Sequence, residues 1–239
     1  SYHQARTRPN KVAVKEVSSG RETTYGQLEE RSCRLASWLQ NKGVKKGDRV
    51  AILIHNCTEV FELEFACAKI GAIELPLNWR LTKPELEYIL NDSSPEVLIY
   101  GSNFEDIAES LLKDCSIKNS LEIDDEDQNN EYEQALRKNI DFDVVETTHD
   151  DLIMLMYTSG TTGHPKGAMI THEMQFYNIV NLAGSSRVTD KTVQLIVLPL
   201  FHTGGMNCYA NPILHYGGQI VLMKEFDPGK ALEIIDCLL

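Results

Sequence analysis

Short apolar runs alternate with longer amphipathic runs along most of this sequence, and this alternation is the strongest constraint on the fold. Residues 24–41 place apolar side chains at helical spacing and end before Gly43, whereas residues 49–54 have the pattern of a buried strand. The same pair returns as a helix at 58–70 and a strand at 73–77. Parallel strands need long crossover connections, which are usually helices. The order therefore predicts an α/β fold with largely parallel β-sheets flanked by helices.

The rest of the chain continues this pattern and contains two recognisable helix starts. Thr82 and Glu85 form a capping box, and Asp227 followed by Pro228 suits the first turn of a helix. The acidic, Asn-rich segment 122–133 is interpreted as a solvated loop. Further strands are expected at 96–100, 152–157, 167–170, 193–198 and 219–223, and further helices at 82–90, 104–112, 172–183 and from 227 onward.

Composition and charge exclude several classes of protein. The chain has 239 residues, of which 42% are apolar and 24% charged, as in a soluble globular protein and unlike a disordered or collagen-like chain. Its 23 basic and 35 acidic residues give a net charge of −12. Because this charge repels polyanions, we expect no binding to nucleic acid or to an anionic membrane, although a local phosphate pocket is compatible with it.

The sequence carries no pattern that predicts export or a membrane span. Its six cysteines lack C-x-x-C or metal-ligand spacing, so we expect reduced thiols and a cytoplasmic location. The first residues lack the apolar core of a signal peptide. Residues 192–223 are uncharged, but their prolines, glycines and polar side chains favour buried strands joined by loops over a transmembrane helix. The sequence leaves open whether the protein forms a homodimer.

Residues 157–167 concentrate groups that bind phosphate. The segment reads Tyr-Thr-Ser-Gly-Thr-Thr-Gly-His-Pro-Lys-Gly and follows a predicted strand. Glycines let successive backbone amides converge on one point, and the Ser and Thr hydroxyls add donors with little bulk. Lys166 adds a mobile positive charge. The pattern indicates a nest for phosphate oxygens.

Two other interpretations of this segment fit less well. A Walker A loop has Gly before its lysine and Ser or Thr after it, where this chain has Pro165 and Gly167. Without that hydroxyl, which holds Mg²⁺ in P-loop NTPases, that class is disfavoured. The remaining alternative is a plain glycine-serine hairpin. The pattern Thr-Ser-Gly-Thr-Thr-Gly-x-Pro-Lys-Gly argues against it, because it is far narrower than that of a generic Gly/Ser/Thr loop.

Together with four other segments, this signature resembles the AMP-forming adenylating enzymes, which include acyl-CoA synthetases, luciferases and peptide-synthetase adenylation domains. The resemblance is weak only over 116–146. The four other segments occur in the family's order: Thr-Tyr-Gly-Gln-Leu at 24–28, Ala-Lys-Ile-Gly-Ala through Leu-Pro-Leu-Asn at 68–78, Leu-Thr-Lys-Pro-Glu-Leu at 81–86, and Leu-Pro-Leu-Phe-His-Thr-Gly-Gly at 198–205.

The resemblance implies an activity and a set of substrates. A carboxylate and ATP would give an acyl-adenylate and pyrophosphate, and a thiol, usually CoA, would then displace AMP. This is the chemistry of an AMP-forming acid–thiol ligase, an acyl-CoA ligase that uses ATP, Mg²⁺ and CoA. The motifs at 78–82 and 199–205 are more similar to those of acyl-CoA synthetases, which implies a fatty or other apolar acid.

The resemblance also assigns the site residues. No catalytic role falls in this chain, because the family's catalytic lysine belongs to a later domain. A lone histidine in an uncharged run is usually a core residue. For His202, the surrounding Phe-His-Thr-Gly-Gly motif instead implies a position at the acyl pocket. The ATP phosphates would be bound by Thr158, Ser159, Gly160, Thr161, Thr162, Gly163 and Lys166, with Thr158 near Mg²⁺, and the acyl or adenylate pocket would be lined by Phe201, His202, Gly204, Gly205 and Met206.

On the same grounds, residues 1–239 are expected to be an incomplete N-terminal AMP-binding (adenylation) domain, without its C-terminal part and the small C-terminal domain. The family's later aromatic-Gly-x-Thr-Glu segment, ribose aspartate, hinge and catalytic lysine do not occur in the sequence. We therefore expect these residues alone to be inactive. The alternative is a non-catalytic nucleotide-binding or structural module that retains the phosphate loop.

Overall fold

The computed structural model describes residues 2–124, 127, 129–138, 141–158 and 164–238. They form two compact units, and each is described here by itself. The first unit comprises Ser1–Arg31, His55–Glu62 and Glu173–Leu239, and the second comprises Ser32–Ile54 and Leu63–His172. The chain passes from one unit to the other four times: within α2 (Tyr25–Asn41), just before α3 (Thr58–Ile70), within α3, and at the start of α7 (His172–Ser186).

The second unit is built on a six-stranded sheet in the order β6-β5-β3-β4-β7-β8. All neighbouring strands are parallel except β7 and β8, which form an antiparallel pair at one edge. Ala51 in the central strand β3 is level with Leu75 of β4 and Leu98 of β5. The strands are β3 (Arg49–Leu53), β4 (Ile73–Pro76), β5 (Val97–Gly101), β6 (Asn119–Ile123), β7 (Leu152–Thr158) and β8 (Lys166–Thr171).

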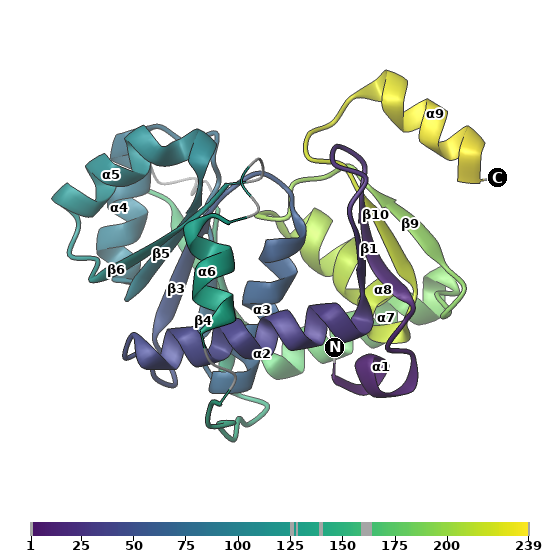
Figure 1. The fold of residues 1–239 in the computed structure, drawn as a ribbon, viewed down its shortest axis with the longest axis horizontal. Helices are drawn as coiled ribbons and strands as arrows, with labels where there is room; N and C mark the ends of the chain where they lie inside the picture. The colour runs from purple at the N-terminus through teal and green to yellow at the C-terminus, as the bar shows by residue number, and fades with distance from the viewer. Residues whose placement is uncertain (1, 125–126, 128, 139–140, 159–163, 239) are drawn as a thin grey trace. The chain divides into compact units, whose positions relative to one another are not determined.

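Helices cover both faces of this sheet (Figure 1). On one face lie α4 (Lys83–Ser93) and α5 (Glu105–Asp114), and a short 3₁₀ turn at Ser102–Phe104 joins β5 to α5. These helices bury Leu86, Leu90 and Leu111 against β3, β4 and β5. The predicted capping residues of α4 meet, since the Thr82 backbone N–H donates to the Glu85 carboxylate at 2.8 Å. This confirms the α/β prediction for the second unit.

The prediction of a solvated loop over 122–133 is wrong at both ends. Glu122 and Ile123 belong to β6, which pairs with β5. A short helix, α6 (Glu131–Arg137), begins after Asn130, whose side chain accepts the Glu133 backbone N–H at 3.0 Å. The acidic composition gave no apolar pattern for these elements, because only a few of their side chains, such as Tyr132, are buried in the core.

The first unit contains a four-stranded sheet in the order β2-β1-β10-β9. β1 (Val12–Glu16) pairs in parallel with β10 (Gln219–Leu222), and β10 pairs in parallel with β9 (Val193–Ile196). β2 (Glu22–Thr24) is the antiparallel edge strand. The sequence patterns did not predict β1 and β2, because β1 is only five residues long and β2 has three residues that are all polar.

The segment between β9 and β10 is mostly helical, which corrects the expectation that loops join the strands there. A π-helix runs over Gly204–Ala210 and continues directly into α8 (Asn211–Tyr216). Figure 1 shows α8 beside β10. The other helices of this unit are α1 (Tyr2–Thr7), α7 (His172–Ser186) and α9 (Pro228–Leu238).

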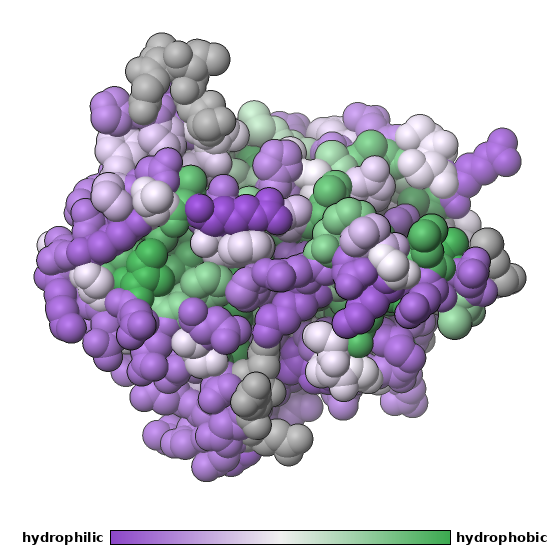
Figure 2. All heavy atoms as spheres, turned by 90° about the horizontal axis from the view of Figure 1, so that it is seen from above, coloured by the Kyte–Doolittle hydropathy of each residue, from purple (hydrophilic) through white to green (hydrophobic). Residues whose placement is uncertain are grey.

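The surface agrees with the charge of the sequence. Figure 2 shows hydrophilic side chains over most of the visible face, with apolar patches between them. Met174, Tyr177 and Phe226 are among the large apolar side chains that remain exposed. No helix in the described part of the chain has the length and hydropathy needed to cross a membrane.

Candidate functional site

The hairpin of β7 and β8 holds the two ends of the glycine-rich segment. Thr158 is the last residue of β7, Lys166 is the first of β8, and the two lie directly opposite each other in the antiparallel register. Both side chains are exposed. A hydroxyl and an ammonium group therefore lie at the base of the turn that sequence analysis assigned to phosphate. Of the other residues assigned there, Ser159, Gly160, Thr161, Thr162 and Gly163 lie outside the described residues.

Packing fixes this hairpin one residue below its end. The Tyr157 hydroxyl donates to the Asp92 carboxylate of α4 at 2.5 Å, and both burial and the nearby Asp92 charge raise the pKa of Tyr157. Tyr157 lies opposite Gly167, where an added Cβ would approach the Leu155 side chain to 2.8 Å. Gly167 therefore serves close packing between the strands. The His164 ring stacks on Tyr88, with ring centroids 4.9 Å apart.

A buried carboxyl group lies in the strand next to β7. Glu74 of β4 is level with Met154 of β7, is fully buried, and has no hydrogen-bond partner for either carboxylate oxygen among the described residues. Burial, together with the nearby charge of Glu64, raises the pKa of Glu74 well above its usual value. Burial and the charge of Glu64 therefore favour the protonated form of Glu74.

The first unit contains the other predicted site, the turn around His202 (Figure 1, between β9 and α8). The His202 side chain is exposed, and its backbone N–H donates to the Pro199 carbonyl at 3.2 Å. Its Nδ1 accepts the Gly204 backbone N–H at 3.1 Å, and its carbonyl accepts the Met206 N–H at 3.1 Å. Three hydrogen bonds therefore fix both the backbone and the ring of His202.

The two glycines after His202 differ in the space around them. A Cβ on Gly205 would lie 2.3 Å from the Pro199 carbonyl oxygen, so no side chain fits there. A Cβ on Gly204 would meet its nearest atom, in Leu198, at 3.3 Å. Met206 is fully buried and Phe201 is half-buried. Whether these side chains line an acyl pocket stays a prediction.

A row of buried amides follows the turn, and sequence analysis missed it. Asn207 and Asn211 are 5% and 4% exposed and lie one turn apart in the π-helix and α8. The Asn211 amide donates to Asn207 Oδ1 at 3.3 Å, and Asn178 of α7 donates to the Asn207 carbonyl at 2.8 Å. π-helical turns are frequent at functional sites, and here the buried amides hold one in place. An uncharged sequence with two asparagines gave no signal for this row.

Asn56 is a second residue that sequence analysis missed. It is 7% exposed and precedes α3. Its Nδ2 donates to the Leu198 carbonyl at 3.0 Å and to the Met223 carbonyl at 3.1 Å. Its Oδ1 accepts the Leu200 backbone N–H at 2.9 Å. Asn56 thus joins the segments that follow β9 and β10.

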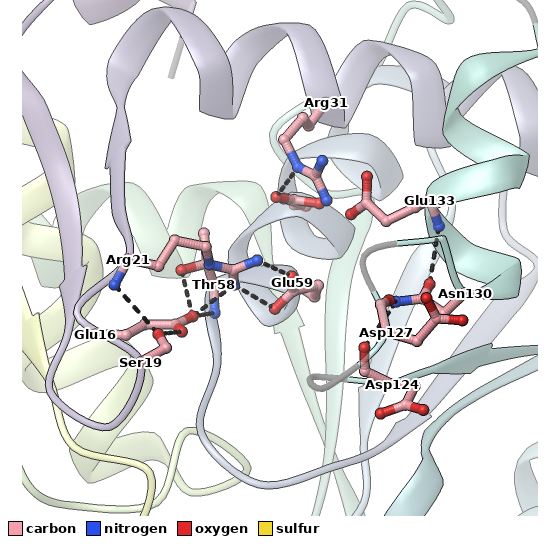
Figure 3. Close-up of polar contacts among 11 residues, drawn as sticks. Glu16, Ser19, Arg21, Arg31, Thr58, Glu59, Asp124, Asp127, Asn130 and Glu133 are labelled. Atoms are coloured by element: carbon pink, nitrogen blue, oxygen red, sulfur yellow. Dashed lines mark hydrogen bonds and ion pairs between the residues drawn. The ribbon is translucent and has the colours of Figure 1, made fainter.

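The start of α3 is held by a buried network of charges (Figure 3). The Glu16 carboxylate accepts the Thr58 backbone N–H at 2.9 Å and its hydroxyl at 2.7 Å. The Arg21 guanidinium lies between two carboxylates, 2.6 Å from both Glu16 and Glu59. Burial opposes ionisation of Glu59, but the charge of Arg21 outweighs it and lowers the pKa of Glu59. The Arg21 charge therefore favours the ionised form of Glu59.

The described residues contain no group of three or more His, Cys, Asp or Glu side chains that could hold a metal ion. The role of Thr158 near Mg²⁺ therefore stays a prediction. The hairpin belongs to the second unit and the His202 turn to the first.

The sequence and the fold are similar to those of known proteins. A family model described as AMP-binding enzyme matches residues 1–237. The feruloyl-CoA synthase of an Amycolatopsis species is 36% identical over 233 residues, which cover 98% of this chain and 45% of the relative. The long-chain-fatty-acid–CoA ligase FadD13 of Mycobacterium tuberculosis is 32% identical over 232 residues, which cover 97% of this chain and 46% of the relative. The chain thus spans just under half the length of these relatives.

Solved structures agree. The inhibitor-bound N-terminal domain of FACL13 from Mycobacterium tuberculosis matches 98% of this chain and 58% of its own, with a TM-score of 0.87 and 31% identity. ATP-bound MatB from Rhodopseudomonas palustris matches 98% of this chain and 47% of its own, with a TM-score of 0.85 and 29% identity. The chain therefore belongs to the AMP-binding enzyme family, and its relatives are acyl-CoA ligases.

Proposed function

We propose that the whole protein is an AMP-forming acyl-CoA ligase. In the first step a carboxylate oxygen attacks the α-phosphorus of ATP, which gives an acyl-adenylate and releases pyrophosphate. In the second step the CoA thiol attacks the acyl carbon, a thioester forms, AMP leaves and the thiol proton goes to solvent. Activation is needed because a free carboxylate has no good leaving group.

The observation that carries this proposal is the hairpin that sets Thr158 opposite Lys166 at the base of the glycine-rich turn. The exposed hydroxyl and ammonium fit the tail of a nucleoside triphosphate, and residues 158–163 would bind its β- and γ-phosphates through backbone amides and hydroxyls. Mg²⁺, when bound, would neutralise phosphate charge near Thr158. Lys166 would pair with the phosphates or order the turn.

The His202 turn would hold the acid substrate. With Nδ1 occupied by the Gly204 N–H, a neutral His202 ring carries its proton on Nε2. Because the residue is exposed, this N–H could donate to a carboxylate or adenylate oxygen. Phe201, Gly204, Gly205 and Met206 would shape the surrounding pocket. An apolar acid fits best, because the relatives include a feruloyl-CoA synthase, a long-chain-fatty-acid–CoA ligase and an indoleacetate–CoA ligase.

We expect the protein to work in the cytoplasm, since the spacing of its six cysteines matches neither a C-x-x-C motif nor a metal site. The test of function is an ATP–pyrophosphate exchange assay on the whole protein with ferulate, indoleacetate, long-chain fatty acids and malonate, followed by CoA-dependent AMP release. Exchange with an apolar acid supports a ligase, whereas nucleotide binding without exchange for any acid supports the non-catalytic module.

A paired substitution in the second unit tests the phosphate assignment. Lys166→Ala should raise the KM for ATP about tenfold or more, because a charge-assisted contact to phosphate is lost. Lys113→Ala removes another exposed lysine of this unit, whose ammonium lies 3.4 Å from the Glu109 carboxylate one turn away. This control should leave the KM for ATP unchanged. Equal behaviour of the two variants would contradict a role for Lys166.

A further inference from the structure

Asn56 makes three hydrogen bonds to backbone groups that lie far away in the sequence. Two of them hold the short connection that leads from β9 to His202, at the Leu198 carbonyl and the Leu200 N–H. The third, to the Met223 carbonyl, ties this connection to the end of β10. Leu200 is 1% exposed, so its N–H has no access to water as an alternative partner.

The position of Asn56 is itself fixed from the other side. Two residues later, the Thr58 backbone N–H and hydroxyl bind the Glu16 carboxylate, which Arg21 links to Glu59 (Figure 3). These charge-assisted contacts are short, those between Thr58 and Glu16 are buried, and together they anchor the first turn of α3 to the end of β1. Asn56 therefore presents its amide from a rigid support.

The connection that Asn56 holds also contacts the far side of the His202 turn. Gly205 packs against the Leu198–Pro199 backbone so closely that its Cβ position is 2.8 Å from the Leu198 carbonyl oxygen. The same carbonyl accepts the Asn56 amide. A shift of the connection would therefore move the backbone on both sides of His202.

We propose that Asn56 is a positioning residue for the carboxylate subsite. Its amide fixes the connection at 198–200, and through it the orientation of Phe201 and His202 toward the acid. This inference rests on the proposed function of the His202 turn. Only a primary amide suits the position, because two carbonyl acceptors and one N–H donor require two donors and one acceptor from the same side chain.

The test uses the whole protein with Asn56→Asp, Asn56→Ala and a matched control. An ionised Asp would face two carbonyl oxygens, so Asn56→Asp should lower kcat/KM for the acid about 10- to 100-fold at pH 8 and leave the KM for ATP within about twofold. Burial raises the pKa of such an Asp, and once protonated it can donate to one carbonyl. The loss of kcat/KM for the acid in Asn56→Asp, relative to wild type, should therefore become several-fold smaller at pH 6. The loss in Asn56→Ala should not change in this way.

The control is Ser37→Ala, which removes another buried donor to a backbone carbonyl, Ser37 Oγ to Asp141 at 2.8 Å, in the second unit. It should lower Tm without changing the KM for the acid. The inference is wrong if both Asn56 variants lower Tm and leave the acid kinetics as they are in Ser37→Ala, or if the pH recovery of Asn56→Asp is absent.

Amide exchange separates this inference from the proposed function. In Asn56→Ala, exchange at the Leu200 and His202 amides should rise at least tenfold, whereas the amides of β10 should keep their protection. Wild type without acid-dependent exchange of pyrophosphate would refute the proposed function, and the amide data would still decide whether Asn56 positions the turn. Unchanged protection at Leu200 and His202 would overturn the inference.

Discussion

The Gly204 backbone N–H donates to Nδ1 of His202 at 3.1 Å. This contact closes the turn on its own side chain, and it leaves Nε2 as the nitrogen that carries the proton in the neutral ring. The ring is exposed, so the Nε2–H is available to a ligand. This backbone contact thus decides which of the two imidazole nitrogens acts as the hydrogen-bond donor.

The first prediction concerns this tautomer. In the neutral form, ¹⁵N chemical shifts of His202 should show a pyrrole-like Nε2 and a pyridine-like Nδ1. His202→Asn keeps an acceptor for the Gly204 N–H but lacks the Nε2 donor. We expect it to retain wild-type Tm and to lose on the order of 100-fold in kcat/KM for the acid. Wild-type kinetics in this variant would remove His202 from the site.

Substitution of two neighbouring glycines should have unequal effects. Gly205→Ala places a Cβ 2.3 Å from the Pro199 carbonyl oxygen, and the required shift of backbone should cost about 1–3 kcal/mol of unfolding free energy. Gly204→Ala meets its nearest atom at 3.3 Å and should cost less than about 1 kcal/mol. Denaturant unfolding measures both values. Equal destabilisation by the two substitutions would contradict the close contact between Gly205 and the Pro199 carbonyl oxygen.

Removal of the Arg21 charge should destabilise the first unit in a pH-dependent way. Arg21→Met leaves the carboxylates of Glu16 and Glu59 buried without a cation, at a cost on the order of 3 kcal/mol at pH 7. In wild type the lowered pKa of Glu59 contributes stability above the unfolded carboxyl pKa, and this contribution is lost as the pH falls through the folded value. The gap in Tm between variant and wild type should therefore narrow as the pH falls below the unfolded carboxyl pKa.

An exposed ion pair provides the control for that experiment. Lys15 lies 2.8 Å from Glu22 at the surface, with both side chains nearly half exposed. Lys15→Met should change the free energy of unfolding by less than about 1 kcal/mol at any pH. An Arg21→Met variant that behaves like this one would show that the network adds nothing beyond a surface pair.

Glu74 should weaken the fold as the pH rises. Its folded pKa is raised, so between the unfolded carboxyl pKa and the folded one the native state holds a proton that the unfolded state has lost, and stability falls with increasing pH. Glu74→Gln keeps the shape and removes the titration. It should raise Tm more at pH 8 than at pH 5, as measured by thermal unfolding. A pH-independent effect would contradict a buried neutral acid.

Local sequence patterns predicted much of the fold because helices and buried strands leave a periodic signal. The predicted helix at 58–70 coincides with α3 (Thr58–Ile70), and the capping pair Thr82 and Glu85 meets as expected. Elements that are short or largely polar escaped detection. β1 and β2, along with α6, are stabilised mainly by partners elsewhere in the chain, so their own residues carry little pattern.

The candidate site shows the same division. The composition of residues 157–167 by itself indicated a phosphate-binding turn, since glycines, hydroxyls and a lysine are chemically suited to an anion wherever they lie together. Only the tertiary structure shows that Asn56 meets Leu198, 142 positions away, and that Arg21 meets Glu59. Hydrogen bonds between distant residues depend on how strands are ordered in a sheet, and that order is set by packing of the whole unit. The sequence determined the chemistry of the phosphate-binding turn, and the folded chain decided which residues hold the His202 turn in place.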